Sequence, residues 1–377
     1  MFSVLRLLRT NQLPTAALTA LLLGVFYPPA ARIFAPAGSV FLQFLSLVGP
    51  LLVLLVAFDI AKNRRFREQL RGAGAVLCAF VVSTACCSLS AAALSYAVIS
   101  CGFSTWLPPV PGMPTPELWW TPPPWILPGA IATGLFLGCI PSLQAQRITS
   151  SVKTSLMNII RRTAPIGVFC LLCTTFAGSP FEFLRHVGST AGLMVIGSLL
   201  GLVVINPCVA AVLLQRSPVQ LALDVLKQSA LPAFASRSSL ANIPFNLELC
   251  EAHGVPESLS NIAIPLGAIF NMPGAAVTMA ALLTLLLGPQ AELWTIPAAA
   301  LLAFGASFGI VGIPNGTGTV LPAIFAFLAL PPDQQLLGMG LYFAASVVQD
   351  PFGTALNSSS DAFLTIAVYH RSAACPH

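Results

Sequence analysis

Gln349-Asp350-Pro351-Phe352-Gly353-Thr354-Ala355-Leu356-Asn357-Ser358-Ser359-Ser360-Asp361 is a polar stretch inside the last long apolar segment, about residues 335–369. Four polar side chains recur at spacings of four, three and four residues: Asp350, Thr354, Asn357 and Asp361. At about 3.6 residues per turn they share one face of a helix. If the helix crosses a membrane, each ionisable group costs about 2.5–3.5 kcal/mol, so the stripe must face protein, water, a ligand or an ion. The alternative is that hydrogen bonds within the bundle satisfy both carboxylates.

The composition of the 377 residues is that of a membrane protein. Hydrophobic residues make up 56% and charged residues 8%, whereas a soluble domain has about 25% charged residues. We therefore expect an all-α polytopic membrane protein. Among ten cysteines, Cys170 and Cys173 form a CxxC in an apolar helix without a nearby histidine, so we interpret them as core residues. Neither a zinc site nor an organic cofactor is expected.

Basic residues orient the first half of the chain. Five of them lie within residues 62–71, and none occurs from residue 72 to 146. This asymmetry predicts that odd-numbered spans run outward and that both termini are cytoplasmic, with Arg32 and Arg185 as exceptions. It accounts for the net charge of +5 without a nucleic-acid partner. The expected elements are spans over about residues 13–34, 40–61, 73–101, 126–143, 165–176 with the residues directly after it, and 188–214, and an amphipathic cytoplasmic helix over residues 147–162.

Two segments of the second half are predicted to form re-entrant hairpins. Residues 221–251 are too long and too interrupted for one helix, which indicates two half-helices meeting at a serine-rich tip. Such a tip is tolerated at membrane depth only where it is buried or faces a cavity. Residues 295–330 repeat the pattern with a glycine-rich tip. One hairpin starts inside and the other outside, so the halves form inverted repeats, which are typical of secondary transporters.

The helix between the hairpins is interrupted at Asn271-Met272-Pro273-Gly274. Its proline removes a backbone donor, which frees carbonyls near residues 267–271. In transporters, carbonyls of broken helices coordinate Na⁺. Asn271, Asn357 and Asp361 are further oxygen ligands of the kind that this hard cation prefers.

Three ordered motifs carry a resemblance to a known family. They are Ser236-Arg237-Ser238-Ser239-Leu240-Ala241-Asn242-Ile243-Pro244 with Asn246-Leu247-Glu248-Leu249-Cys250-Glu251, Ile264-Pro265-Leu266-Gly267-Ala268 with Asn271-Met272-Pro273-Gly274-Ala275, and Gln349-Asp350 with Thr354-Ala355-Leu356-Asn357-Ser358-Ser359 and Asp361. The chain here resembles the dicarboxylate/amino acid:cation symporters, which have the glutamate-transporter fold. It is most similar to the bacterial serine/threonine:sodium symporters. The resemblance covers roughly residues 40–370 and is strong from residue 221 onward.

The resemblance implies eight transmembrane helices and two re-entrant hairpins in the bacterial inner membrane. Residues 1–220 would hold spans one to six, which are the scaffold and part of the transport domain. Residues 221–377 would form the core transport domain. A family member is a homotrimer whose scaffold stays in place while the hairpins and their helices move across the membrane as an elevator. The second hairpin would be the outer gate.

The resemblance also assigns substrate contacts. Asp350 would bind the amino group of the substrate, and Thr354 and Asn357 would hold its backbone. The substrate carboxylate would be contacted by Ser238 and Ser239 at the first tip and by Gly312 and Ile313 at the second.

Two sodium sites are implied in the same way. One Na⁺ would bind the carbonyls of Gly267 and Asn271 together with Asn357 and Asp361. The second would bind the carbonyls of Ile269, Ser307, Phe308 and Ile310. Na⁺ would be the transported coupling ion.

Departures from the family pattern bear on the substrate. Members that carry acidic substrates have an arginine where this chain has Gly353. Without it, a side-chain carboxylate would be buried unpaired at a cost of several kcal/mol. We therefore expect a small neutral amino acid, serine or threonine first and alanine next. Pro273 and Ala275 replace an aspartate and a threonine of those members, which indicates a low sodium count.

The expected function is a secondary active symporter that couples Na⁺ entry to uptake of small neutral amino acids. The alternatives are an Na⁺- or H⁺-coupled symporter of dicarboxylates or acidic amino acids, and a non-transporting receptor that senses amino acids. An intramembrane hydrolase is disfavoured, because Asp350 and Asp361 lie about 16 Å apart along a helix, too far to share a proton. Arg237 is either a charge partner for Asp350 or a capping or interfacial residue.

Overall fold

The structure is a computed structural model in which the described residues are 12–62, 73–102, 126–138, 143–176, 180–215, 217–287, 293–308, 310 and 316–374. These residues form helices and turns, and no strand occurs among them. The all-helical fold class predicted from the composition is confirmed at this level. Contacts divide the chain into two compact units that alternate along the sequence.

The first unit comprises residues 1–63, 105–190 and 318–347. Its complete helices are α2 (Gln12–Phe26), α3 (Pro28–Ile33), α4 (Ala35–Lys62), α7 (Ile126–Gly138), α8 (Leu143–Phe176) and α17 (Leu321–Phe327). The long helix α4 packs against α7, α8 and α17, and α2 packs against α8. The unit is therefore built around α4.

Two elements of this unit differ from the sequence-based expectation. The amphipathic helix and the fifth span belong to one helix, α8, with Pro165 inside it, although residues 147–160 and 162–173 are bent by 43° against each other. The first span is divided at Tyr27, because Pro28 and Pro29 start the separate helix α3. In both places the apolar pattern predicted the helical residues, but it did not predict which proline would interrupt the helix.

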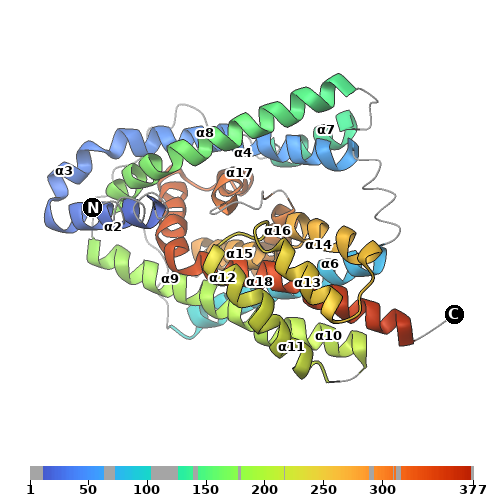
Figure 1. The fold of residues 1–377 in the computed structure, drawn as a ribbon. Coiled ribbons are helices and arrows are strands. Elements are labelled where there is room, and N and C mark those ends of the chain that lie inside the picture. Colours follow the sequence, from blue (N-terminus) through green and yellow to red (C-terminus); the bar gives the residue numbers. More distant parts are fainter. Residues whose placement is uncertain are drawn as a thin grey trace, which may run out of the picture. The chain divides into compact units, whose positions relative to one another are not determined.

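The second unit comprises residues 64–104, 191–317 and 348–377. It contains α6 (Gly74–Ser100), the end of α9 (Pro180–Leu200), η1 (Gly201–Ile205), α10 (Asn206–Leu214), α11 (Val219–Val225), η2 (Leu226–Ala230), α12 (Leu231–Ser236), α13 (Ile243–Ala252), α14 (Glu257–Phe270), α15 (Pro273–Leu287) and α16 (Thr295–Ser307). Helix α15 is buried from Pro273 to Leu286 and packs against α6 and α16. The last helix, α18 (Pro332–Ala374), is drawn in red in Figure 1 and enters this unit at residue 348.

Two π-helical turns precede prolines in this unit. Turn η1 leads into Asn206-Pro207, and η2 leads into Leu231-Pro232. A proline lacks the backbone N–H, and its ring clashes with the carbonyl four residues earlier. A wider turn just before the proline relieves that clash while the helix continues.

The predicted interruptions of the second half are present. Helices α14 and α15 are separated at residues 271 and 272. The first hairpin has one limb of α11, η2 and α12, a tip at residues 237–242, and α13 as the other limb. The tip of the second hairpin lies mostly outside the described residues, so the second hairpin stays a prediction, as does the re-entrant course of the first.

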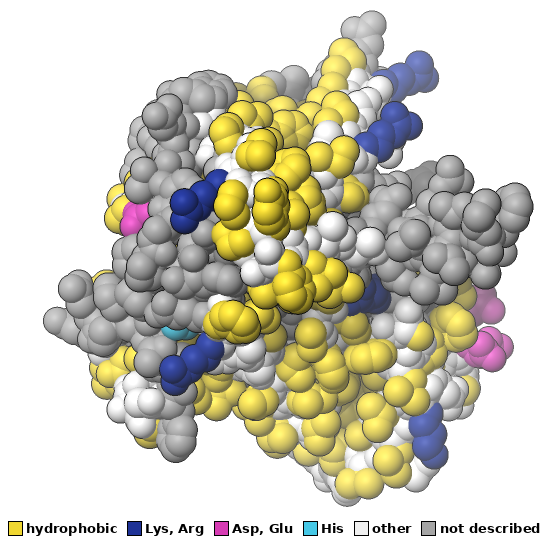
Figure 2. Space-filling model, turned by 90° about the vertical axis from the view of Figure 1, so that its left-hand side faces the viewer, with side chains coloured by type: hydrophobic (Ala, Val, Ile, Leu, Met, Phe, Trp, Pro, Cys, Tyr) yellow, Lys and Arg dark blue, Asp and Glu magenta, His cyan; other side chains and the backbone are white. Residues whose placement is uncertain are grey.

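Three helical segments are long and apolar enough to cross a membrane: residues 74–100, 183–214 and 257–287. A bent pair within residues 147–173 would be a fourth among the residues that the structure describes. Hydrophobic side chains cover much of the face in Figure 2, and large apolar side chains such as Val203 and Val212 are exposed. Eight spans, and the division at residues 220 and 221, stay predictions.

Candidate functional site

The polar stripe lies on the part of α18 that belongs to the second unit. Its two ends differ in burial: the side chain of Asp350 is 18% exposed and Asp361 is 0% exposed, while Thr354 between them is buried and Asn357 is partly buried. The stripe therefore has an accessible end at Asp350 and a closed end at Asp361. These two ends have different neighbours.

At the closed end, the carboxylate of Asp361 contacts the break between α14 and α15. Asn271, the first residue of the break, donates from Nδ2 to Asp361 Oδ1 at 2.9 Å and to Ser360 Oγ at 2.6 Å. Thr84 on α6 donates to Asn271 Oδ1 at 3.1 Å. A methyl group built on Gly267 would overlap the Asp361 carboxylate. The carboxylate thus lies directly against the backbone of α14.

One oxygen of this carboxylate has no partner within the described part of the chain. Asp361 Oδ2 is buried and accepts no hydrogen bond there. A buried acceptor without a donor is costly and calls for a further partner. Neutral oxygens with one carboxylate suit a hard cation, whereas transition metals favour His and Cys. No cluster of three His, Cys, Asp or Glu side chains exists among the described residues.

The break itself is fixed to α18 by a backbone contact. Gly274 N donates to Asn357 Oδ1 at 2.7 Å. A methyl group on Gly274 would overlap the backbone of Gly353, so only glycine permits this approach. The Gly267 carbonyl accepts a hydrogen bond from Asn271 N at 2.8 Å. It therefore keeps one lone pair for another ligand, rather than being wholly free as the proline suggested.

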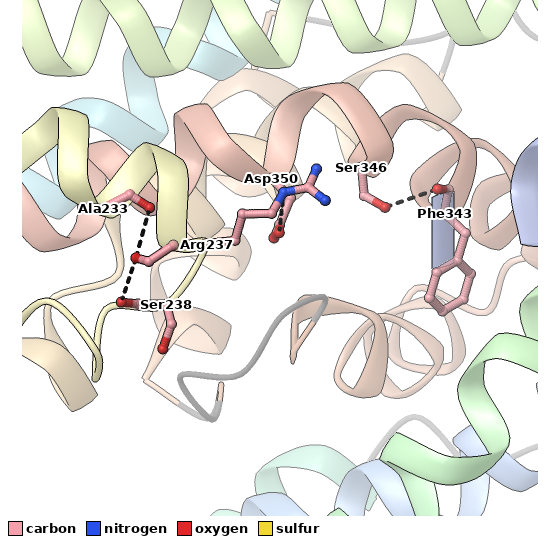
Figure 3. Close-up of polar contacts among 7 residues, drawn as sticks. Ala233, Arg237, Ser238, Phe343, Ser346 and Asp350 are labelled. Atoms are coloured by element: carbon pink, nitrogen blue, oxygen red, sulfur yellow. Dashed lines mark hydrogen bonds and ion pairs between the residues drawn. The ribbon is translucent and has the colours of Figure 1, made fainter. Parts of the chain in front are cut away.

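At the accessible end, Asp350 faces the tip of the first hairpin. Arg237 Nε lies 3.8 Å from Asp350 Oδ2, and the two side chains point toward each other in Figure 3. Arg237 has a φ of 54° and ends α12, with its N–H bonded to Ala233 O at 2.9 Å. Both interpretations of Arg237 therefore apply: its backbone caps a helix and its side chain pairs with Asp350.

The tip carries the two predicted serines. Ser238 Oγ accepts a hydrogen bond from Ala241 N at 3.2 Å, and Ser239 is buried. The backbone N–H of Asn242 donates to Ser239 O at 3.2 Å. These contacts hold the tip as a closed turn next to the Arg237–Asp350 pair.

An amide cluster that sequence reasoning missed fastens the hairpin to α18. Asn242 Nδ2 donates to Ser358 Oγ at 2.8 Å, and Asn246 Nδ2 donates to Ser358 O at 2.8 Å. Ser229, on the other limb, donates to Asn246 Oδ1 at 2.5 Å. The available signal was the pair Asn242 and Asn246, four residues apart in an apolar limb.

The remaining predicted residues are placed less completely. Gly312 and Ile313 lie outside the described residues. Ser307 ends α16, and its carbonyl accepts from Ile310 N at 3.3 Å. Ile269 is on α14 and Phe308 follows α16. The second sodium site stays a prediction.

Apolar spans, a broken helix and a buried carboxylate beside the break are features of membrane transporters. The sequence profile of the sodium:dicarboxylate symporter family matches residues 141–371, so the chain belongs to this family of sodium-coupled symporters. It is 28% identical over 401 aligned positions to the serine/threonine transporter SstT of Acinetobacter baylyi, and the alignment covers 98% of each chain. The resemblance inferred from the motifs is confirmed.

Proposed function

We propose that the protein is a symporter that couples Na⁺ entry to the uptake of serine and threonine across the bacterial inner membrane. The observation that supports this proposal most directly is the Arg237–Asp350 pair at the accessible end of the stripe. An α-amino acid has an ammonium and a carboxylate, which complement these two charges. A dicarboxylate has no ammonium group to offer to Asp350.

The substrate site follows from this complementarity. The ammonium group binds Asp350, with Thr354 and Asn357 on the same face. The carboxylate binds the tip of the first hairpin at Ser238 and Ser239, near Arg237, and the second tip at Gly312 and Ile313. The name of the Acinetobacter relative supports serine and threonine as the substrates.

The ion site lies at the closed end. One Na⁺ is bound by Asp361, Asn271, Asn357 and the Gly267 carbonyl. This ion is the partner that the buried Oδ2 of Asp361 otherwise lacks. A second Na⁺ binds the carbonyls of Ile269, Ser307, Phe308 and Ile310. Because the closed end is buried, the ion must lose its water there. Ligation by protein oxygens offsets that dehydration.

The proposal includes the architecture implied by the resemblance. Eight spans and two re-entrant hairpins form a homotrimer with both termini in the cytoplasm. Residues 221–377 supply the core of the domain that moves as an elevator. The two interruptions of the second half support this part of the proposal.

A second candidate is a carrier of dicarboxylates or acidic amino acids, which the description of the matched family favours. Uptake of labelled serine into proteoliposomes, with an inward gradient of Na⁺ or of choline, tests both. We expect Na⁺-driven accumulation that unlabelled threonine inhibits and succinate and aspartate do not. Inhibition by succinate or aspartate but not threonine would favour the second candidate. Serine binding without counterflow exchange would indicate a receptor.

A further inference from the structure

The space that a side chain on Gly353 would take is filled by another residue. A methyl group built on Gly353 would lie 2.5 Å from Nε2 of Gln349, 3.5 Å from its Cδ and 3.7 Å from its Oε1. Gln349 is four residues earlier on α18, so its side chain reaches one turn along the same face. It is only 4% exposed. The carboxamide of Gln349 therefore occupies the space that a side chain at position 353 would take.

This carboxamide lies next to residues of the candidate site. Gln349 directly precedes Asp350. The backbone of Gly353 is the surface against which Gly274 packs, and Asn357 binds the Gly274 N–H one turn later. A ligand held by Asp350 and Asn357 lies along the part of α18 that carries Gly353 and Gln349.

The chemistry of a carboxamide restricts what such a ligand can present. It is neutral, and it offers two N–H donors and a carbonyl acceptor. A hydroxyl group both donates and accepts, so it can bond to the carboxamide, whereas a methyl group cannot. A second carboxylate would meet a neutral group rather than a cation. Sites that hydrogen-bond a substrate hydroxyl reject the analogue that lacks it more strongly than an apolar pocket does.

We propose that Gln349, folded over Gly353, determines the side-chain specificity of the transporter by selecting a small substrate with a hydroxyl group. This inference rests on the proposed function and names the residue that separates serine from alanine. Position 353 takes part by having no side chain, which leaves the space to the carboxamide.

Two substitutions remove the carboxamide by independent routes. Gln349→Ala deletes it. Gly353→Ala displaces it, because the three atoms nearest to the new methyl group all belong to the flexible end of Gln349. If both act on the same group, the double variant should resemble either single variant. Val348→Ala is the matched control, since Val348 is the preceding residue on α18 and is 54% exposed.

The test measures Na⁺-driven uptake of labelled serine and of labelled alanine by the full-length protein in proteoliposomes, as kcat/KM for each. We expect the serine-to-alanine ratio to fall by up to about tenfold in each single variant, the effect of losing one hydrogen bond. It should fall no further in the double variant and stay unchanged in Val348→Ala. Uptake of alanine should persist, which separates a loss of specificity from a loss of folding.

An unchanged ratio in either active single variant would overturn the inference and leave the proposed function standing. Additive losses in the double variant would also overturn it, because the two changes would then act separately. If Gln349→Ala does not fold, the serine-to-alanine ratio of Gly353→Ala alone tests the inference. Absence of Na⁺-driven uptake of both amino acids by the wild type would overturn the proposed function, and the inference with it.

Discussion

Asp350 and Asp361 lie about three turns apart on one face of α18, in opposite surroundings. Asp350 is partly accessible, and Arg237 on a neighbouring hairpin tip is its charged neighbour at 3.8 Å. Asp361 is fully buried, and its neighbours are the neutral amide of Asn271 and the backbone at Gly267. A group that exchanges a substrate must be reachable from water. A group that holds a small dehydrated cation need not be.

The two carboxylates also differ in how their charges are balanced when no ligand is bound. Arg237 balances the charge of Asp350, so the accessible end is compensated when it is empty. At the closed end, no ion pair joins Asp361 to a basic side chain among the described residues. The two ends should therefore respond differently to substitution, and single variants at each end can measure this.

The largest effect is expected from Asp350→Asn. Truncating one partner of a partly buried charge pair typically costs about 2–5 kcal/mol of binding, which is more than tenfold in affinity. Uptake of serine at low concentration should fall by about this amount, measured as kcat/KM in proteoliposomes. The control is Asp333→Asn in the first turn of α18, which should stay within about twofold of wild type. Equal losses in both variants would contradict a substrate role for Asp350.

Gly267→Ala should disturb the closed end selectively. Its methyl group would displace the carboxylate of Asp361, and overpacking a filled site costs about 1–3 kcal/mol. We expect the Na⁺ concentration for half-maximal uptake to rise by about tenfold. Gly305→Ala on α16 meets nothing within 4 Å and should leave this concentration unchanged. A similar shift in both variants would indicate a general effect on the helices.

Thr84→Ala should act on the same end more weakly. It removes the hydrogen bond to Asn271 Oδ1, and such a bond contributes about 0.5–1.5 kcal/mol. The Na⁺ concentration for half-maximal uptake should rise by a few-fold, up to about tenfold. Thr84→Ser keeps the hydroxyl and should restore the wild-type value. Failure of the serine variant to do so would assign the effect to packing instead.

The smallest effect is expected from Arg237→Gln on the stability of the substrate-free protein. Accessible ion pairs contribute about 0–1 kcal/mol because water and salt screen them, and the Arg237 side chain is 27% exposed. The thermal midpoint should shift by at most a few degrees, and less at high salt. A large shift that salt does not reduce would mean that the Arg237–Asp350 pair is shielded from water, like Asp361 at the closed end.

Much of the fold followed from local sequence features. The period of α18 and the proline at 273 depend only on nearby residues, so they predicted the stripe and the break correctly. The same local rules failed at Pro165, which lies inside helix α8. There the proline bends the helix, by 43° between residues 147–160 and 162–173, and does not end it.

The contacts that organise the site could not be read from the chain in the same way. Ser358 binds amides from a hairpin more than a hundred residues earlier, and no periodicity relates them. The approach of Gly274 to Gly353 depends on how two helices pack. The position of Gln349 over Gly353 depends on a rotamer. These features come from tertiary packing, which local patterns do not specify.

The most direct test is Na⁺-induced thermal stabilisation of the purified protein without substrate, because a ligand that binds only the folded state raises its stability. We predict that Asp350→Asn keeps the stabilisation seen in wild type and that Asp361→Asn loses it, while serine then stabilises only wild type. Retention of the wild-type Na⁺ response in Asp361→Asn, or its loss in Asp350→Asn alone, would contradict the assignment of ion and substrate to opposite ends of the stripe.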